Sequence, residues 1–257
     1  KDSRILSVGD IVTEDRMEML RELNLLETNR FDYTFALGIL GILLMLSAVA
    51  VLYMRFFCQD IFRSTNDLIL LSAIIILTLL LSRIAYVYSA IAIPIFLAPI
   101  LISILLDLRL AVVVNLLLTL AVSLITKGDM RFMLMAVITG TLAAFIVNGA
   151  NQRSKLSAAG LLLALINILV IICIGIIYKS SVRSIATYSL IVAVNGVGSV
   201  ILAVGMLPFL ESTFNIITPL KLLELANPNQ PLMKRLLMEA PGTYHHSLMV
   251  GKLAEVS

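Results

Sequence analysis

The sequence has little charge, no tryptophan, and only two cysteines and two histidines. Charged residues make up 14% of its 257 residues, and hydrophobic residues make up 60%. Soluble domains carry about 25% charged residues. This shortage of charge excludes an ordinary soluble domain and indicates a polytopic membrane protein whose surroundings are the lipid bilayer.

The scarce residues also exclude several kinds of site. Cys58 and Cys173 lie far apart, so they predict neither a disulfide framework nor a metal-binding spacing. The net charge is +3 and there is no basic run, which argues against a nucleic-acid partner. The first ten residues, KDSRILSVGD, are too polar for a signal peptide, and we expect the chain to be a segment of a longer protein.

Seven apolar segments follow residue 32, and a spanning helix needs about 20 mostly apolar residues. The third and fourth are separated only by Asp107-Leu108-Arg109, which predicts a tight hairpin with the charged pair at the membrane surface. Pro94 and Pro99 are expected to kink the third helix. The predicted spans are Tyr33–Met54, Leu68–Val87, Ala90–Leu106, Leu110–Ile125, Phe132–Asn148, Leu156–Tyr178 and Thr187–Leu210.

Seven spans place the two termini on opposite sides of the membrane. Lys and Arg residues are divided equally between the loops of the two sides, so their distribution does not decide the orientation. Lys221, Lys234 and Arg235, after the last span, favour a cytoplasmic C-terminus. Tyrosines gather on the N-terminal side, as an interfacial belt or a ligand-binding cluster: Tyr33, Tyr86, Tyr88, Tyr178 and Tyr188.

Few polar residues interrupt the spans. Asn115, Asn167 and Asn195 are expected to form hydrogen bonds between helices. A transporter would be expected to carry acids or bases on its pathway. Residues 195–199, NGVGS, are not a phosphate loop because no strand precedes them and no lysine follows, so close helix packing is the expected use of their glycines.

Polar segments flank the spans. Thr13 can cap a juxtamembrane helix with an apolar stripe from Met17, although a solvated tail fits residues 1–32 equally well. After the last span, Thr218-Pro219 and Gln230-Pro231 each open a short helix. A further helix is expected after the Pro241-Gly242 break, with Thr243 as its N-cap. The prolines predict a stiff connector that could transmit movement of the seventh helix.

The run NPNQPLMKRLLMEAPGTYHHSLMVGKLAE, residues 227–255, resembles the opening of the HD phosphohydrolase domain of the PgpH-like membrane enzymes. These are bacterial cyclic-di-AMP phosphodiesterases with an extracellular domain, seven membrane helices and a cytoplasmic HD domain. Residues 8–27, VGDIVTEDRMEMLRELNLLE, resemble the end of the extracellular domain. Span count, opposite termini and the proline-rich connector agree with this resemblance.

The resemblance implies that the complete protein hydrolyses cyclic-di-AMP to pApA with two transition metals, manganese or iron. The histidine before Ser in YHHS, His246, corresponds to the first metal ligand. His245 would point about 100° further round the helix, so both are not expected on one metal. Without the resemblance, two adjacent histidines are more often ordinary surface or helix-start residues than metal ligands. The remaining ligands would lie beyond Ser257, so no catalytic residue and no bound metal are expected in this chain, which should be inactive alone.

The sequence therefore predicts an all-α membrane bundle of seven helices, followed by connector helices and the beginning of an HD domain. The expected parts are residues 1–32 (extracellular juxtamembrane), 33–210 (seven transmembrane helices) and 211–257 (cytoplasmic connector and truncated HD domain). The expected location is a bacterial cell membrane, with the N-terminus outside. The expected function is the sensor or anchor portion of the phosphodiesterase. A homodimer is expected only because receptors often signal as pairs, and no feature of the sequence indicates one. A transporter or channel, and a non-catalytic receptor module, remain alternatives.

Overall fold

The computed structural model describes residues 13–14, 17–18, 33–150 and 152–256. Within these ranges every regular element is a helix, and several are apolar and of membrane length, so the predicted all-α membrane bundle is confirmed. The juxtamembrane helix expected near Thr13 lies mostly outside the described residues. Its visible part is a hydrogen bond of 3.0 Å from the backbone N–H of Met17 to the carbonyl of Thr13. The chain forms two compact units, Lys1–Ile42 and Leu43–Ser257.

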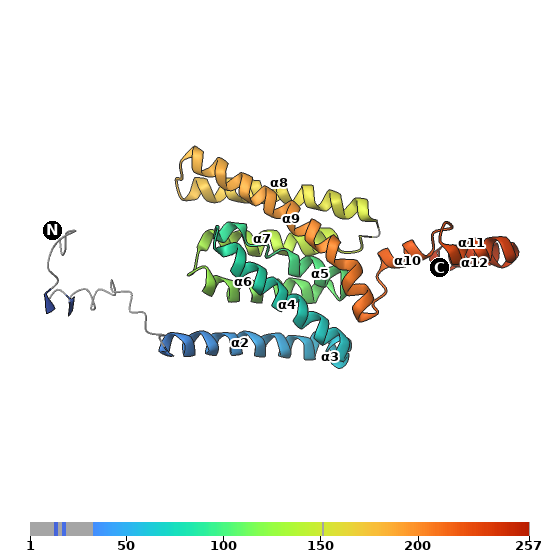
Figure 1. The fold of residues 1–257 in the computed structure, drawn as a ribbon, viewed down its shortest axis with the longest axis horizontal. Coiled ribbons are helices and arrows are strands. Elements are labelled where there is room, and N and C mark those ends of the chain that lie inside the picture. The colour runs from blue at the N-terminus through green and yellow to red at the C-terminus, as the bar shows by residue number, and fades with distance from the viewer. Residues whose placement is uncertain (1–12, 15–16, 19–32, 151, 257) are drawn as a thin grey trace. The chain divides into compact units, whose positions relative to one another are not determined.

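The helices follow one another with short connections (Figure 1). In chain order they are α2 (Tyr33–Phe57), α3 (Gln59–Arg63), α4 (Thr65–Tyr86), the 3-10 turn η1 (Ala90–Ala92), α5 (Leu97–Leu105), α6 (Leu108–Ile125), α7 (Met130–Val147), α8 (Arg153–Ile177), α9 (Val182–Phe214), α10 (Pro219–Leu225), α11 (Pro231–Glu239) and α12 (Pro241–Val256).

Among the described residues, six helices are long and apolar enough to cross a membrane: α2, α4, α6, α7, α8 and α9. Each matches one of the predicted spans closely. The remaining predicted span, the third (Ala90–Leu106), corresponds to the shorter apolar stretch Ala90–Leu105, which contains η1 and α5. The six membrane-length helices of the structure and the seven predicted spans therefore differ only in this one segment.

The third predicted span is broken before Pro94 rather than kinked. Ile93 is extended, with φ −63° and ψ 121°, and α5 starts only at Leu97. A proline has no N–H and disfavours the helical conformation for the residue before it, so a break relieves both conflicts. Pro99 causes no break because it lies in the first turn of α5, where backbone N–H groups lack helical partners in any case.

The broken segment lies at the centre of the core. Eight of its hydrophobic side chains are completely buried: Ile93, Ile95, Phe96, Leu97, Ala98, Ile100, Leu101 and Ile102. Helix α5 contacts α4, α6, α7 and α9. Its nine residues span about 13 Å, less than half of a hydrocarbon core of about 30 Å. Irregular backbone at membrane depth is tolerated where protein surrounds it, which is the case here.

Polar N-caps begin most of the long helices. Asp107 Oδ1 accepts hydrogen bonds from the N–H groups of Arg109 (2.7 Å) and Leu110 (3.2 Å) and so starts α6. The tight hairpin predicted there is confirmed. Ser64, Asp129 and Ser181 cap α4, α7 and α9 in the same way. These caps satisfy N–H groups that the first turn of a helix leaves unpaired.

The connector after α9 consists of the three short helices α10, α11 and α12. Thr218 caps α10 as predicted, accepting from the N–H of Lys221 at 3.1 Å. The predicted N-cap Thr243 is wrong, because α12 already begins at Pro241. The N–H of Tyr244 donates to the carbonyl of Ala240 at 3.1 Å, and proline is well suited to a first helical position.

Candidate functional site

The two histidines lie near the start of α12, and both are exposed. The ring of His245 meets the ring of Tyr244 edge-on, with centroids 5.7 Å apart. The adjacent Ser247 hydroxyl donates to the carbonyl of Thr243 at 2.9 Å. The structure thus places His246 on a solvent-facing helix, and its metal-binding role remains a prediction.

The described residues do not form a metal centre by themselves. Across residues 13–14, 17–18, 33–150 and 152–256, no three His, Cys, Asp or Glu side chains are grouped to hold an ion. A dinuclear site needs several ligands and their supporting hydrogen bonds, so one exposed histidine does not fit two metals. No catalytic step can be assigned to these residues.

The membrane exit contains a buried polar contact. Glu211, in the last turn of α9, and Thr218, before α10, are 7% and 2% exposed. The hydroxyl of Thr218 donates a hydrogen bond to Glu211 Oε1. Between them Asn215 ends α9 in the left-handed conformation, with φ 54°. Within the part of the chain that the structure describes, Glu211 is the one buried charged side chain.

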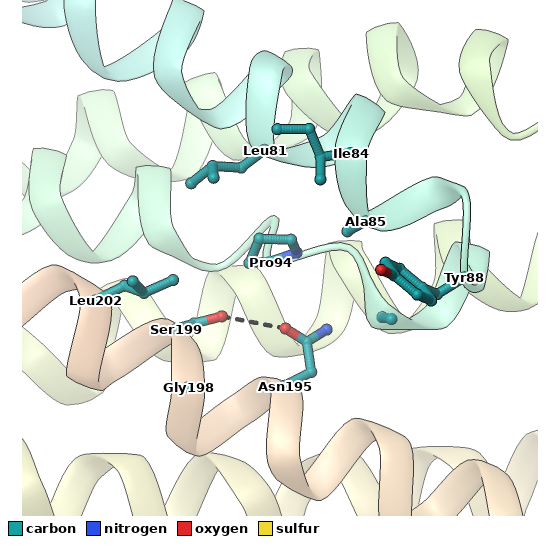
Figure 2. Close-up of a pocket in the computed structure, with 10 residues that line it drawn as sticks. Leu81, Ile84, Ala85, Tyr88, Pro94, Asn195, Gly198, Ser199 and Leu202 are labelled. Carbon is teal, nitrogen blue, oxygen red and sulfur yellow. Dashed lines mark hydrogen bonds between the residues drawn. The ribbon is translucent and has the colours of Figure 1, made fainter.

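Asn195 of α9 holds the broken segment in place. Its Nδ2 group donates to the carbonyls of Ile91 at 3.0 Å and Ile93 at 2.9 Å. Its Oδ1 atom accepts from the hydroxyl of Ser199 at 3.2 Å (Figure 2). An unpaired carbonyl at membrane depth is costly, so Asn195 satisfies the acceptors that the break at Pro94 exposes.

Asn115 and Asn167 join neighbouring helices, as predicted. Asn115 of α6 donates to the carbonyl of Ala136 in α7 at 3.2 Å, and Asn167 of α8 donates to the carbonyl of Val192 in α9 at 3.3 Å. Each amide lies against a glycine of the partner helix. A Cβ at Gly140 would overlap the amide of Asn115.

The second of these glycines, Gly196, supports the predicted close packing of the NGVGS run. A Cβ there would lie 3.0 Å from Asn167 Nδ2 and 3.1 Å from the backbone nitrogen of Ala164. Gly198 differs, because a Cβ at that position would meet no atom within 4 Å. The two glycines of one run therefore have different surroundings.

Two of the clustered tyrosines contact an arginine. The guanidinium carbon of Arg131, at the start of α7, lies 5.1 Å from the ring centroid of Tyr178 and 6.0 Å from that of Tyr188. Cation–π contacts of this length contribute roughly 0.5–2 kcal/mol. These two tyrosines thus link the ends of α7, α8 and α9.

Cys58 lies outside the spans, between α2 and α3, and is buried. Burial raises the pKa of its thiol, and the nearby carboxylate of Asp107 raises this pKa further. The guanidinium of Arg109 acts in the opposite direction. A thiol held protonated is a poor nucleophile, so the site has no feature of a reactive cysteine.

Sequence reasoning missed Glu211 as a functional residue. Its charge in the last turn of an apolar helix, seven residues before a predicted N-cap, is the signal that could have suggested a contact. The long-range partners of Asn195 left no such signal, since Ile91 and Ile93 take part through their backbone.

Comparison with known proteins identifies the family to which the chain is related. A family model described as "7TM receptor with intracellular HD hydrolase" matches residues 33–218. The Cyclic-di-AMP phosphodiesterase PgpH of Bacillus subtilis (strain 168) is 30% identical over 235 residues, covering 84% of this chain and 33% of the relative. Its namesake in Listeria monocytogenes is 29% identical over 267 residues, covering 98% of this chain and 36% of the relative.

A third relative is the uncharacterized protein slr0104 of Synechocystis, 32% identical over 130 residues, which cover 49% of this chain and 16% of that protein. No solved structure matches. The chain spans about a third of the length of the two PgpH relatives. The family model covers more than half of the chain, including every membrane-length helix described above. This chain therefore belongs to the family of seven-transmembrane receptors with an intracellular HD hydrolase.

Proposed function

We propose that the chain is the membrane sensor portion of a metal-dependent phosphodiesterase that hydrolyses cyclic-di-AMP to pApA. Two relatives named Cyclic-di-AMP phosphodiesterase PgpH align with most of the chain, which is the observation that carries the proposal. The proposed arrangement is an extracellular N-terminus, a multi-pass membrane domain and a cytoplasmic C-terminus, with residues 1–32, 33–210 and 211–257 as its three parts. Formation of a homodimer is part of the same proposal.

The proposed path of the signal is α9 and its connection to α10. Helix α9 has 33 residues and is about 50 Å long, which exceeds a hydrocarbon core of about 30 Å. It contacts α8, α5 and α4, and its last turn is joined to the cap of α10 through Glu211 and Thr218. A displacement of α9 would therefore reach α10 through a short, hydrogen-bonded turn rather than through a loose linker.

We propose His246 as a metal ligand of the complete HD domain, with manganese or iron as the metal. This assignment rests on the resemblance of the YHHS run. The other ligands would come from residues beyond Ser257, in a protein about three times as long as this chain, judged by its relatives. In this proposal the described residues supply the connection to that domain.

The alternatives are a transporter or channel and a receptor module without catalytic activity. The described spans contain no buried charge before Glu211, at the far end of α9, and their three asparagines already have helix partners. A transport pathway usually uses intramembrane charges. These contacts favour a receptor-like bundle over a transporter or channel.

The catalytic proposal is tested on the longer protein in detergent with added manganese. We expect chromatography to show conversion of cyclic-di-AMP to pApA, and we expect His246→Ala to abolish this turnover. His245→Ala is the matched control and should retain most activity, since that side chain points elsewhere on the helix. A longer protein that neither turns over cyclic-di-AMP nor binds metal would overturn the proposal.

The relay is tested separately by changing the bilayer. Helices adjust their tilt to bilayer thickness, so the turnover rate of the longer protein in thin and thick bilayers should differ. A flexible Gly/Ser insertion at Asn227 should remove this difference while leaving turnover intact. If the inserted protein keeps the same dependence on thickness, the connector does not transmit movement.

A further inference from the structure

A groove opens on the side of the bundle between α4 and α9, with the broken segment as its floor (Figure 2). Its volume is about 410 Å³. Leu81 and Ile84 of α4 form one wall, Gly198 and Leu202 of α9 form the other, and Pro94 lies on the floor. All of these residues belong to the same compact unit.

Two local features keep the groove open. The break at Pro94 removes the side chains that a continuous helix would place there. Gly198 contributes no side chain, and a Cβ added to it would meet nothing within 4 Å. The opening is therefore a direct result of the sequence at both positions.

The polar atoms on the floor are already paired. The Nδ2 group of Asn195 is bonded to the carbonyls of Ile91 and Ile93, and its Oδ1 atom accepts from Ser199. Among the residues that line the groove, no buried side-chain nitrogen or oxygen lacks a hydrogen-bond partner. Ordered water needs two to four polar partners, so the groove suits hydrocarbon rather than water or a polar ligand.

We propose that this groove binds an acyl chain of a membrane phospholipid. One wall extends from Leu81 in α4 to Tyr88 just after that helix, and the other from Asn195 to Leu202 in α9, a length of about 10 Å. Leu81, Ile84 and Leu202 give the groove apolar walls on helices of membrane length, whose surroundings in a bilayer are lipid hydrocarbon, so an acyl chain matches the groove in chemistry.

Tyr88 indicates the end from which the chain enters. It lies just after α4, lines the groove and is 86% exposed. Tyrosines favour the membrane–water interface, so this end lies at headgroup level. The acyl chain runs from Tyr88 towards Leu202 and contacts both α4 and α9.

The first test measures lipid that stays with the protein. This chain is purified in mild detergent, incubated with dioleoyl phosphatidylglycerol and examined by native mass spectrometry. We expect one lipid to remain on the wild type and its occupancy to fall at least fivefold in Gly198→Phe, which adds a large side chain at a position where a Cβ meets no atom within 4 Å. Gly205→Phe is the control on the same helix, since Gly205 is equally open but does not line the groove.

Ala85→Leu narrows the opposite wall and provides a second variant if Gly198→Phe does not fold. Retention that is equal in the wild type and in a folded groove-filling variant would show surface lipid only and overturn the proposal. Loss of a dimer in Gly198→Phe, with lipid retention unchanged, would overturn it in favour of an interface between two copies.

The absence of tryptophan permits a second measurement. A single Leu202→Trp places a fluorophore in the groove, whereas Leu190→Trp places one on the exposed face of α9 outside it. Brominated phosphatidylglycerol should quench the first at about one lipid per protein and the second only at higher ratios. Identical quenching curves would contradict a specific site.

Discussion

The hydroxyl of Thr218 donates a hydrogen bond to the buried carboxylate of Glu211 and accepts one from the backbone N–H of Lys221. A single oxygen atom thereby joins the end of α9 to the first turn of α10. Loss of this hydroxyl removes the cap of α10 and also removes the only described hydrogen-bond partner of the Glu211 carboxylate.

Thr218→Val should loosen α10 and leave the buried Glu211 carboxylate, in the last turn of α9, without its hydrogen bond. Loss of an N-cap costs about 0.5–2 kcal/mol, which corresponds to roughly 2- to 30-fold faster amide exchange in Pro219–Leu225. Hydrogen exchange measured by mass spectrometry tests this, with Thr218→Ser as the control that keeps the hydroxyl. Unchanged exchange in the valine variant would show that the contact does not hold α10.

Gly140→Ala should destabilise the pairing of α6 and α7. The new Cβ would overlap the amide of Asn115, and overpacking of this kind costs about 1–3 kcal/mol. The midpoint of unfolding in mixtures of SDS and mild detergent should fall accordingly. Adding Asn115→Ala to Gly140→Ala should recover part of the loss, and strict additivity would argue against direct contact.

Asn195→Ala should destabilise the broken segment. The substitution leaves the carbonyl of Ile91 without this donor, at a cost of about 1–3 kcal/mol for one unsatisfied group, whereas the carbonyl of Ile93 still accepts from the N–H of Ile95 at 2.8 Å. Ser199→Ala removes only the donor to Asn195 and should cost less. Unfolding midpoints measured side by side give the comparison, and an Asn195→Ala midpoint equal to that of the wild type would contradict the assigned role.

Alkylation of Cys58 should be slow at neutral pH and accelerate only above the ordinary thiol pKa of about 8.5. Burial and the Asp107 carboxylate both raise the pKa of Cys58, so less thiolate is present at a given pH. In a Cys173→Ala background, a water-soluble maleimide measures the rate. Asp107→Asn should shift the pH profile downwards and Arg109→Gln upwards, and shifts of the same sign would refute this electrostatic account.

The membrane helices could be predicted because their signals are local. Hydropathy located the spans, and Asp107 and Thr218 marked their own helix starts through side-chain caps. The tail was harder, since the Pro241-Gly242 break was expected to precede the last helix, whereas α12 begins at Pro241 itself. In each case the deciding atoms lie within a few residues of one another.

The break at Pro94 and the groove could not be predicted in the same way. A proline inside an apolar run is compatible with a kink or a break, and the choice depends on Asn195, which lies about a hundred residues further along the chain. The open surroundings of Gly198 likewise depend on the position of α4. Such features depend on tertiary partners that local patterns do not reveal.

The separation between the broken segment and Asn195 also has a consequence for biosynthesis. The acceptors at Ile91 and Ile93 precede their donor by 104 and 102 residues. At 5–20 residues per second, synthesis of that stretch takes about 5–20 s. During this time the break must be shielded by the insertion machinery or by neighbouring helices, and the bundle can lock around its centre only after α9 has entered the membrane.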